Sequence, residues 1–319
     1  MSFKILGTGS CLPKRSVTNE ELSQFLDTSD EWISQRVGIK ARRICTTETT
    51  ADLAVGAAKA AMEMSGVTAD ELDFILCATV TADNTTPSLA CSVQSMIGAT
   101  CPSMDINAAC SGFIYLLETA AAFLSMKHER ILIIGAERLT RVVDWTDRST
   151  AVIFADGAGA MVLGKGDSYI SSKLVAKGGD TVLSIPSFHG TSPFYEVEPK
   201  KPYVHMSGQE VFKFAVNAMC NDLADVIEAA GLTMDDIAWV IPHQANARII
   251  DAAVRKFGIK PERCLKNIET TGNTSAASVA ILADELFRSG KLKDGDYIAM
   301  AAFGAGLTSA ACVIKWDGN

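Results

Sequence analysis

The sequence has few histidines, few aromatic residues and no excess of positive charge. Its 319 residues include 4 His, and 29 Lys and Arg stand against 37 Asp and Glu, for a net charge of −8. A chain this acidic lacks the broad basic surface of nucleic-acid-binding proteins, so no nucleic-acid partner is expected. We find no apolar run near the roughly 18 residues that span a bilayer, and the start, MSFKILGTGSCLP, lacks the apolar core of a signal peptide. We therefore expect a cytoplasmic protein without membrane contact.

The cysteines form no pattern. There are 9 of them, an odd number, with no CxxC pair and no regular spacing. This argues against a disulfide framework and against a zinc site, so no metal is expected. Most of these thiols, Cys77 and Cys312 among them, are expected to be small buried core residues.

Short apolar runs alternate with helical patterns along the chain. Strands are predicted at residues 73–80, 130–137 and 159–165, and helices at 51–66 and 217–231. The two helices end at Gly66 and Gly231, and glycine is a common helix stop. Alternation of this kind predicts an α/β protein with largely buried sheets.

The chain also repeats itself. GVTADELDFIL starts at Gly66 and GLTMDDIAWVI starts at Gly231, 165 residues further on. Later, DGAGAMVLG (residues 156–164) is echoed by FGAGLTSAACVI (residues 303–314). Two matches in the same order indicate a duplicated α/β unit. We place the boundary at residues 164–168, which gives two halves, 1–165 and 166–319.

Cys110 lies at a junction between a strand and a helix. The segment SMDINAACSGFIYLLETAAAFL, residues 103–124, has a short apolar start and then apolar positions at helical spacing from Ser111. Free N–H groups and the dipole at a helix N-terminus favour a thiolate, which is the nucleophilic form. The alternative is a buried, inert cysteine.

Two further residues could assist such a thiolate. His243 follows an apolar run that ends at Pro242 and precedes a helical pattern, the place where α/β proteins put their chemistry. By contrast, His128 is expected on the solvated surface, and His189 and His205 in a loop. Asn273, in a GNTS turn before an Ala-rich helix, is either a helix cap or a hydrogen-bond donor to an oxyanion.

Together these segments resemble a known family. NAACSGF around Cys110, HQANARI around His243 and TGNTSAASV around Asn273 are similar to the motifs of β-ketoacyl-acyl carrier protein synthase III, a thiolase-fold condensing enzyme. GTGSCLP, TSDEWISQRVGIKARR, TDRSTAVIFADGAGA, SGQEVFKFAV and FGAGLTSA extend the likeness from end to end. The resemblance implies a thiolase-like fold of five αβαβα layers in two duplicated halves, which agrees with the repeat.

The resemblance also implies a reaction. Cys110 takes an acyl group from an acyl-CoA, and the acyl-cysteine condenses with malonyl-acyl carrier protein as carbon dioxide leaves, so fatty acid synthesis is initiated without any cofactor. Asn273 in the third catalytic role favours this initiating enzyme over the elongating ones, which use a second histidine. The family is usually homodimeric, so a homodimer is expected.

Site residues carry over by motif. Cys110, His243 and Asn273 are implied as catalytic, and the backbone N–H groups of Cys110 and Ala305 as the oxyanion hole. Coenzyme A and its pantetheine arm are expected to contact Thr28, Trp32, Arg36, Arg148, Gly208, Phe212, Ala245 and Asn246. Carrier protein is acidic, so a local basic patch should meet it, and we expect Lys213, Gln244, Ala245, Asn246, Ala247, Arg248 and Lys256 to form this contact.

Some alternatives stay open. A related enzyme of specialised metabolism that uses a non-acetyl primer would share these motifs, whereas a silent acyl-thioester binding subunit would not need all three catalytic residues. A hydrolase is a third possibility, yet no general base for water is evident. Thr86 stands where several relatives carry a bulky aromatic residue at the end of the acyl pocket, so primers longer than acetyl are expected to fit.

Overall fold

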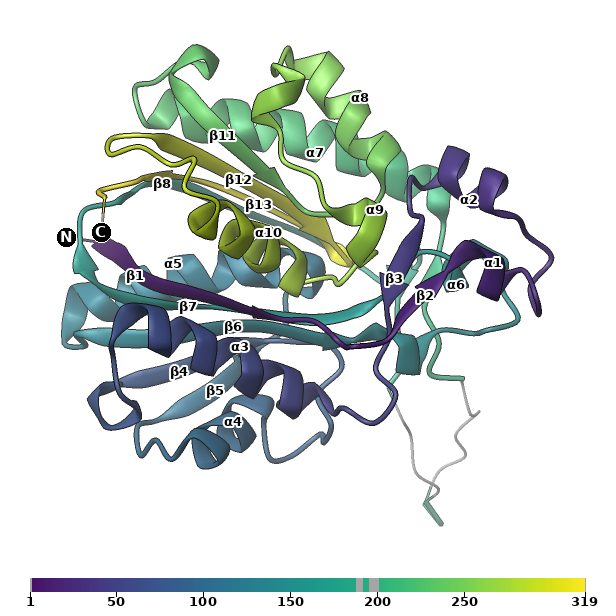
Figure 1. Ribbon diagram of the computed structural model, residues 1–319, viewed down its shortest axis with the longest axis horizontal. Helices are drawn as coiled ribbons and strands as arrows, with labels where there is room; N and C mark the ends of the chain where they lie inside the picture. Colours follow the sequence, from purple (N-terminus) through teal and green to yellow (C-terminus); the bar gives the residue numbers. More distant parts are fainter. Residues whose placement is uncertain (1, 188–191, 195–200, 319) are drawn as a thin grey trace.

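Two β-sheets lie between three layers of helices (Figure 1). The computed structural model describes residues 2–187, 192–194 and 201–318. His189, which we expected in a loop, lies outside the described residues. The first sheet has the order β1-β7-β6-β4-β5 and the second the order β11-β12-β13-β8. The predicted five-layered αβαβα architecture is confirmed.

The sheets show the duplication directly. Reading the second sheet from its other edge gives β8-β13-β12-β11, which matches β1-β7-β6-β4 strand for strand. In each sheet the first two pairings are antiparallel and the third is parallel. The first sheet consists of β1 (Ser2–Cys11), β4 (Phe74–Ala78), β5 (Ser103–Ile106), β6 (Arg130–Arg138) and β7 (Asp156–Gly166). The second consists of β8 (Tyr169–Gly179), β11 (Ile237–Pro242), β12 (Tyr297–Gly304) and β13 (Gly306–Lys315). The division into halves 1–165 and 166–319 stays a prediction.

The sequence repeat has the same local structure twice. Gly66 and Gly231 both have a φ of 70°, a left-handed conformation that glycine adopts without strain. A short 3₁₀ turn follows each of them, and a capping box closes it, between Thr68 and Glu71 in the first copy and between Thr233 and Asp236 in the second. The chain then enters β4 or β11. The repeated residues therefore build one helix-stop, turn and strand unit in each half.

Two helices, α5 (Gly112–Met126) and α10 (Ala277–Arg288), form the central layer between the sheets (Figure 1). Gly159 on β7 allows α10 to approach closely, since a Cβ there would lie 2.5 Å from the Ala280 side chain. Our expectation about apolar runs was wrong here, because the helix Ala109–Met126 is long and apolar enough to cross a bilayer by length and composition. Its side chains Phe113, Leu117 and Leu124 are fully buried among both sheets, so a core position between two apolar sheets accounts for its composition.

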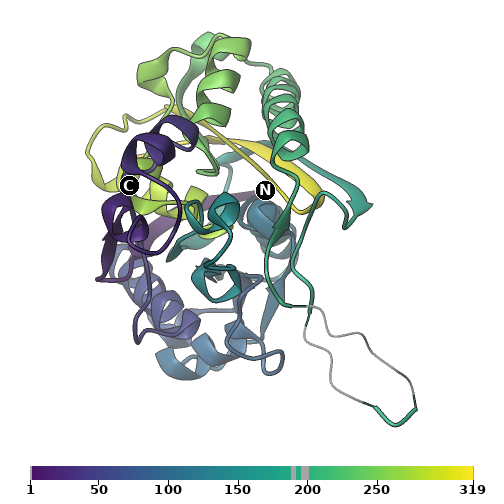
Figure 2. The same ribbon diagram turned by 90° about the vertical axis from the view of Figure 1, so that its right-hand side faces the viewer.

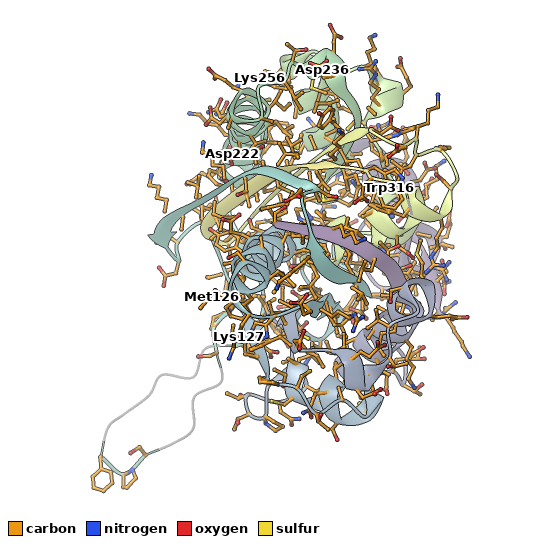
Figure 3. The ribbon with its side chains drawn as sticks, turned by 90° about the vertical axis from the view of Figure 1, so that its left-hand side faces the viewer. Met126, Lys127, Asp222, Asp236, Lys256 and Trp316 are labelled. Carbon is orange, nitrogen blue, oxygen red and sulfur yellow. The ribbon has the colours of Figure 1, made fainter. Side chains whose placement is uncertain are left out.

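The outer layers are also helical. Helices α3 (Thr50–Ser65) and α4 (Leu89–Ile97) cover the first sheet, and α7 (Gly208–Ala229) and α8 (Ala247–Phe257) cover the second (Figure 1). Helix α7 begins nine residues before the helix predicted at 217–231, with Gly208 as its first residue. Figure 3 views one end of the layers and shows Met126 and Lys127 there, where α5 ends, with Lys256 of α8 and Asp222 of α7 above them.

Small elements collect at the other end of the layers (Figure 2). They are β2 (Ser16–Thr18), α1 (Asn19–Leu22), α2 (Asp30–Arg36), β3 (Ala41–Arg43), α6 (Arg148–Ala151), β9 (Leu183–Ser184), β10 (His205–Met206) and α9 (Ile268–Thr271). Strands β4, β5, β6, β11 and β12 come to their carboxyl ends beside them, which is where open α/β sheets bind ligands. His128, expected in solvent, is half-buried, and its ring lies 5.6 Å from that of Phe74 and 5.8 Å from that of Phe123.

Candidate active site

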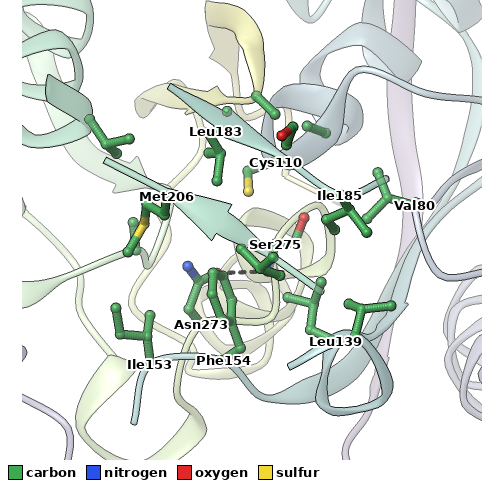
Figure 4. Close-up of a pocket in the computed structure, with 18 of the residues that line it drawn as sticks. Val80, Cys110, Leu139, Ile153, Phe154, Leu183, Ile185, Met206, Asn273 and Ser275 are labelled. Atoms are coloured by element: carbon green, nitrogen blue, oxygen red, sulfur yellow. Dashed lines mark hydrogen bonds between the residues drawn. The ribbon is translucent and has the colours of Figure 1, made fainter. Parts of the chain in front are cut away.

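A cavity of about 970 Å³ opens at the carboxyl ends of the strands. Cys110, His243 and Asn273 all line it, from segments far apart in the sequence. Figure 4 shows Cys110 and Asn273 in this cavity. Cys110 follows β5, His243 follows β11, and Asn273 precedes α10. The three side chains predicted to act together therefore share one cavity.

Backbone geometry fixes the position of Cys110. The residue lies in a 3₁₀ turn, Ala109–Ser111, that leads directly into α5. Ala109, just before it, has a φ of +48°, which is rare outside glycine and is typical of functional sites. Gly304, at the end of β12, packs so closely that a Cβ there would lie 2.6 Å from the Cys110 nitrogen. The Cys110 turn thus rests on the loop that carries Ala305, which also lines the cavity.

The electrostatics of Cys110 differ from our expectation. Burial raises the pKa of its thiol to about 12, and the Ser275 hydroxyl, which lowers it through a hydrogen bond, does not offset this. The resting group is therefore a thiol, although a helix N-terminus alone would favour the thiolate. Desolvation of the charged form is the stronger effect at this depth, so formation of the thiolate would require a neighbouring proton acceptor.

His243 is held as a neutral imidazole. Burial lowers its pKa to about 3, and the residue is 1% exposed. Its Nδ1 lies 2.6 Å from the Ser278 hydroxyl, and its ring meets the Phe303 ring edge-on with 5.3 Å between centroids. With Nδ1 engaged by Ser278, Nε2 is the nitrogen left to meet a substrate.

Asn273 is oriented by its own turn. The Ser275 backbone N–H donates to Asn273 Oδ1 at 2.8 Å, so the NH₂ group of the side chain faces the cavity (Figure 4). Backbone hydrogen bonds join Asn273 to Ile153 and Ala155. Of the two sequence interpretations, the helix cap is wrong, because Asn273 lies four residues before α10 and its oxygen caps only its own turn. The amide is free to donate to an oxyanion.

Comparisons with known proteins identify the family of this chain. The family 3-oxoacyl-[acyl-carrier-protein (ACP)] synthase III matches residues 104–178, and its C-terminal counterpart matches residues 227–316. A protein of Caldanaerobacter subterraneus subsp. tengcongensis, beta-ketoacyl-[acyl-carrier-protein] synthase III, is 47% identical, and the alignment covers 98% of this chain and 97% of that protein. The chain belongs to the β-ketoacyl-[acyl-carrier-protein] synthase III family. Members of this family are condensing acyltransferases.

Solved structures place the chain in the same family. The 3-oxoacyl-[acyl-carrier-protein] synthase III of Aquifex aeolicus superposes with a TM-score of 0.93 at 42% identity and covers 98% of this chain and 100% of its own. The priming β-ketosynthase of the R1128 polyketide pathway superposes with a TM-score of 0.92 at 36% identity, covering 99% of this chain and 96% of its own. The synthase III fold therefore also serves a pathway of specialised metabolism.

A tryptophan and two arginines lie together at the opening of the cavity. Trp32 and Arg36, both on α2, line it. The guanidinium carbon of Arg148 lies 5.1 Å from the Trp32 ring centroid and that of Arg36 lies 6.0 Å away. Arg148 is also bonded to the Asp27 backbone oxygen at 2.5 Å. The structure thus brings together three of the residues expected to meet coenzyme A.

The other predicted substrate residues divide into two groups. Gly208, Phe212, Ala245 and Asn246 line the cavity. Asn246 also caps α8 and donates from Nδ2 to the Arg36 backbone oxygen at 3.2 Å, which ties α8 to α2. Thr28 does not line the cavity, and its hydroxyl is buried without a hydrogen-bond partner among the described residues.

The predicted carrier-protein patch needs one correction. Gln244 is fully buried, and its side chain bonds the Pro242 oxygen and the backbone N–H groups of Asn267 and Ile268, so it cannot meet a partner. It was placed in the patch only through its neighbours in the motif. Lys213, Arg248 and Lys256 are exposed, whereas Ala245 and Ala247 are covered to differing degrees. Lys256 lies at the far end of α8 and bonds Asn217.

Thr86 lies outside the acyl pocket of its own chain. The residue is exposed in the loop before α4, and its neighbour Thr85 lines the cavity instead. The side chains around Cys110 are apolar and come from other segments, Val80, Leu139, Ile153, Phe154, Leu183, Ile185 and Met206 (Figure 4). A role for Thr86 in primer choice therefore requires a second subunit.

Sequence reasoning missed Glu137, Ser275 and Ser278. Glu137 is fully buried at the end of β6, and burial raises its pKa to about 7. A carboxylate that ends the apolar run RILIIGAE was the available signal, since a charged residue at the carboxyl end of a buried strand is a site candidate. Ser275 and Ser278 carried no signal in the sequence, because only the fold brings the Ser275 hydroxyl close to Cys110 and the Ser278 hydroxyl close to His243.

Proposed function

We propose that the chain joins an acyl group from acyl-CoA to the two-carbon unit of malonyl-acyl carrier protein, with loss of carbon dioxide, and so initiates fatty acid synthesis. The observation that carries this proposal is the meeting of Cys110, His243 and Asn273 in one mostly apolar cavity. Membership of the synthase III family supports the same reaction. No metal or redox cofactor is needed, because decarboxylation drives carbon–carbon bond formation.

In the first stage Cys110 attacks the carbonyl carbon of the acyl thioester, and the thiolate of coenzyme A leaves. The negative charge that develops on the carbonyl oxygen needs donors already in place. The backbone N–H groups of Cys110 and Ala305 fit this role because Gly304 holds their two loops in contact. Losing one such donor typically costs about 3–4 kcal/mol of transition-state stabilisation.

In the second stage the malonyl thioester replaces coenzyme A. The Asn273 NH₂ and the neutral His243 imidazole donate to its carbonyl oxygen, which becomes an enolate oxygen as the carboxylate leaves as carbon dioxide. A neutral imidazole suits this task, and the lowered pKa of His243 keeps it neutral. The enolate carbon then attacks the acyl carbon on Cys110, the Cys110 sulfur departs, and a 3-oxoacyl thioester remains.

The mouth of the cavity suits a coenzyme A nucleotide. The guanidinium group of Arg148 lies over the Trp32 ring. An adenine ring could stack on the indole in place of this group, with the guanidinium groups of Arg36 and Arg148 still near the phosphates. Exposed Arg248 and Lys213 supply positive charge for an acidic carrier protein. A location in the cytoplasm stays part of the proposal.

A homodimer is part of the same proposal. Strand β5 is the outermost strand of the first sheet among the residues that the structure describes, and α4 beside it carries exposed Met96. An uncovered edge strand is a ready site for pairing with a second copy. The loop that holds Thr86 leads into α4, so such pairing would place this loop at the interface.

A second candidate differs only in the primer. The likeness to a polyketide priming β-ketosynthase favours it, because that enzyme has the same fold at 36% identity. The chemistry at Cys110 would be unchanged, and a non-acetyl acyl-CoA would load in preference to acetyl-CoA. The primer that loads separates the two functions.

Intact-protein mass spectrometry after incubation with a series of acyl-CoAs tests the proposal. We expect one acyl group per chain, and Cys110→Ala should abolish it. Cys91→Ala is the matched control, because Cys91 is exposed and hydrogen bonds from Ser103 and Ser88 lower the pKa of its thiol, which makes it prone to unspecific acylation. Loading that survives Cys110→Ala and disappears with Cys91→Ala would refute the assignment.

A further inference from the structure

Glu137 is a fully buried carboxyl group that the reaction steps above do not use. Three residues at the end of β4 donate to it, through the Thr79 hydroxyl at 3.3 Å, the Val80 N–H at 3.1 and 3.2 Å, and the Thr81 hydroxyl. The fourth donor is the Ser275 hydroxyl, at 3.3 Å from Oε1. Donors from two separate segments thus hold the carboxyl group behind the cavity wall.

Ser275 connects this carboxyl group to the nucleophile. Ser275 and Cys110 line the same cavity, and the Ser275 hydroxyl is close enough to the Cys110 sulfur to lower the pKa of the thiol. The same hydroxyl donates a hydrogen bond to Glu137. The backbone N–H of Ser275 holds Asn273, and its φ of +49° is a strained value for serine. The strain persists because three contacts depend on this one residue (Figure 4 shows Cys110, Ser275 and Asn273 together).

We propose that Ser275 and Glu137 form a proton relay, in which Glu137 stores the thiol proton of Cys110 between the two half-reactions. The inference rests on the proposed function and deepens it. The proton leaves the Cys110 sulfur for the Ser275 oxygen, while the Ser275 hydroxyl proton passes to Oε1 of Glu137. One S–H bond breaks, one O–H bond forms on Glu137, and Ser275 ends unchanged.

The proton count closes over the whole cycle. During acylation the departing coenzyme A thiolate takes its proton from water. During condensation the Cys110 thiolate leaves the tetrahedral adduct, and the relay returns the stored proton from Glu137 to sulfur. Over the whole cycle one proton is taken from water, and it ends on the thiol of coenzyme A. This count is correct, because loss of carbon dioxide from a malonyl carboxylate consumes one proton overall.

His243 is the competing proton acceptor. Burial raises the pKa of Glu137 to about 7 and lowers that of His243 to about 3, so the carboxyl group holds a proton from a thiol more readily than the imidazole does. Among titratable groups, Cys110 is close enough to Glu137 for the charge of the carboxylate to raise the pKa of its thiol. Arg138 and Asp156 are partners in the register of β6 and β7, one position beyond Glu137. Asp156 already accepts hydrogen bonds from Thr140 and from the Cys45 N–H.

The experiment compares Ser275→Ala and Glu137→Gln with the wild type. Ser275→Ala removes the hydroxyl but keeps the N–H that holds Asn273. We expect acyl-Cys110 formation from acetyl-CoA to slow by about 10²-fold in both variants, the usual weight of a proton-transfer group. The wild-type rate should rise with pH through about 7 as Glu137 ionises, and this rise should vanish in both variants. Glu118→Gln is the control, since Glu118 on α5 bonds Tyr169 and Ser172 and should leave the rate unchanged.

A second measurement separates a relay from a structural role. In a Cys110→Ala background, release of carbon dioxide from malonyl-CoA needs His243 and Asn273 but no thiol proton. Adding Ser275→Ala should leave this release unchanged. A parallel fall in acylation and decarboxylation would show that Ser275 only positions Asn273, and normal acylation in Glu137→Gln would also overturn the relay.

A third measurement uses the wild-type protein, so it tests the relay even if a variant fails to fold. Infrared difference spectra of the wild-type protein before and after acetylation should gain a protonated carboxyl band, and a spectrum without that band contradicts the proposal. If no acyl-CoA acylates the wild type, the proposed function itself fails. Iodoacetamide alkylation of Cys110 then still reports on the relay, because its rate should drop in Ser275→Ala in either case.

Discussion

At the scale of single residues, burial is the main cause of the shifted pKa values of Cys110, Glu137 and His243. It raises the pKa of Cys110 and of Glu137 and lowers that of His243. Cys110 and His243 therefore rest in their neutral forms, and Glu137 is only partly ionised near pH 7. A neutral resting site costs less desolvation energy than an ion pair would at the same depth.

The neutral state of His243 predicts a pH dependence of stability. Its pKa is about 3 in the folded chain and 6.5 ordinarily, so the unfolded chain binds the proton more tightly. Stability from this group is complete above about pH 6.5 and declines as pH falls toward about 3, by up to ~1.4 kcal/mol per pH unit. Glu137 acts in the opposite sense, since a raised carboxyl pKa removes stability as pH rises toward about 7.

Comparison of the wild type with His243→Gln isolates the histidine, because Glu137 is common to both chains. Denaturant unfolding between about pH 4.5 and pH 6.5 should give a difference in unfolding free energy that grows in favour of the wild type as pH rises. If the unfolding free energies of the two proteins change with pH in parallel, His243 is not buried as a neutral group.

The motifs of the sequence predicted that Cys110, His243 and Asn273 belong to one site, and all three line one cavity. The sequence did not predict the direction of the Cys110 pKa shift, because this shift depends on burial depth.

At the scale of elements, the loops at the strand ends matter more than the strands themselves. The spacing of apolar residues in the sequence predicted which segments are helices and which are strands, because β6, β7 and α3 are long and have regular patterns. The start of α7 did not follow, since its first turns are amphipathic and hold Gly208. The sequence likewise could not show that Gly304 and Cys110 touch, because 194 residues separate them and only the packing of η2 (Ala109–Ser111) on β12 joins them.

This contact predicts the effect of Gly304→Ala. A new Cβ would lie 2.6 Å from the Cys110 nitrogen, so the turn must move and the oxyanion hole must open. Acyl-Cys110 formation should fall by about 10²–10³-fold, as when one oxyanion donor is lost. Quenched-flow mass spectrometry would measure the rate. Gly178→Ala, also near a strand end but with no atom within 4 Å of its new Cβ, should acylate normally. Equal rates in the two variants would contradict the assignment of Ala305 and Cys110.

At the scale of the whole molecule, the duplicated sheets explain where the site lies. Matching strand orders bring the carboxyl ends of β4, β5, β6, β11 and β12 to the same end of the central helical layer. One half then supplies Cys110 and Glu137, and the other supplies His243 and Asn273. The repeat in the sequence predicted the duplicated α/β unit but not the end at which the strands of the two sheets meet, because that depends on how the two sheets pack.

The range of primer lengths that the protein accepts tests whether a second copy of the chain contributes to the acyl pocket. Thr86 is exposed in one chain, so it can limit the acyl pocket only from a partner subunit. If the dimer forms through β5 and α4, Thr86→Phe should lower kcat/KM for six- to eight-carbon acyl-CoAs by about 10-fold or more, as expected when methylene groups lose their space. Acetyl-CoA, which does not reach that depth, should be used as before. Asn84→Phe, an equal ring in the same exposed loop, is the control, and analytical ultracentrifugation establishes the oligomeric state of each variant. If Thr86→Phe slows all primers alike, or if the active species sediments as a monomer, primer length is set within one chain by side chains such as Leu139 and Ile185.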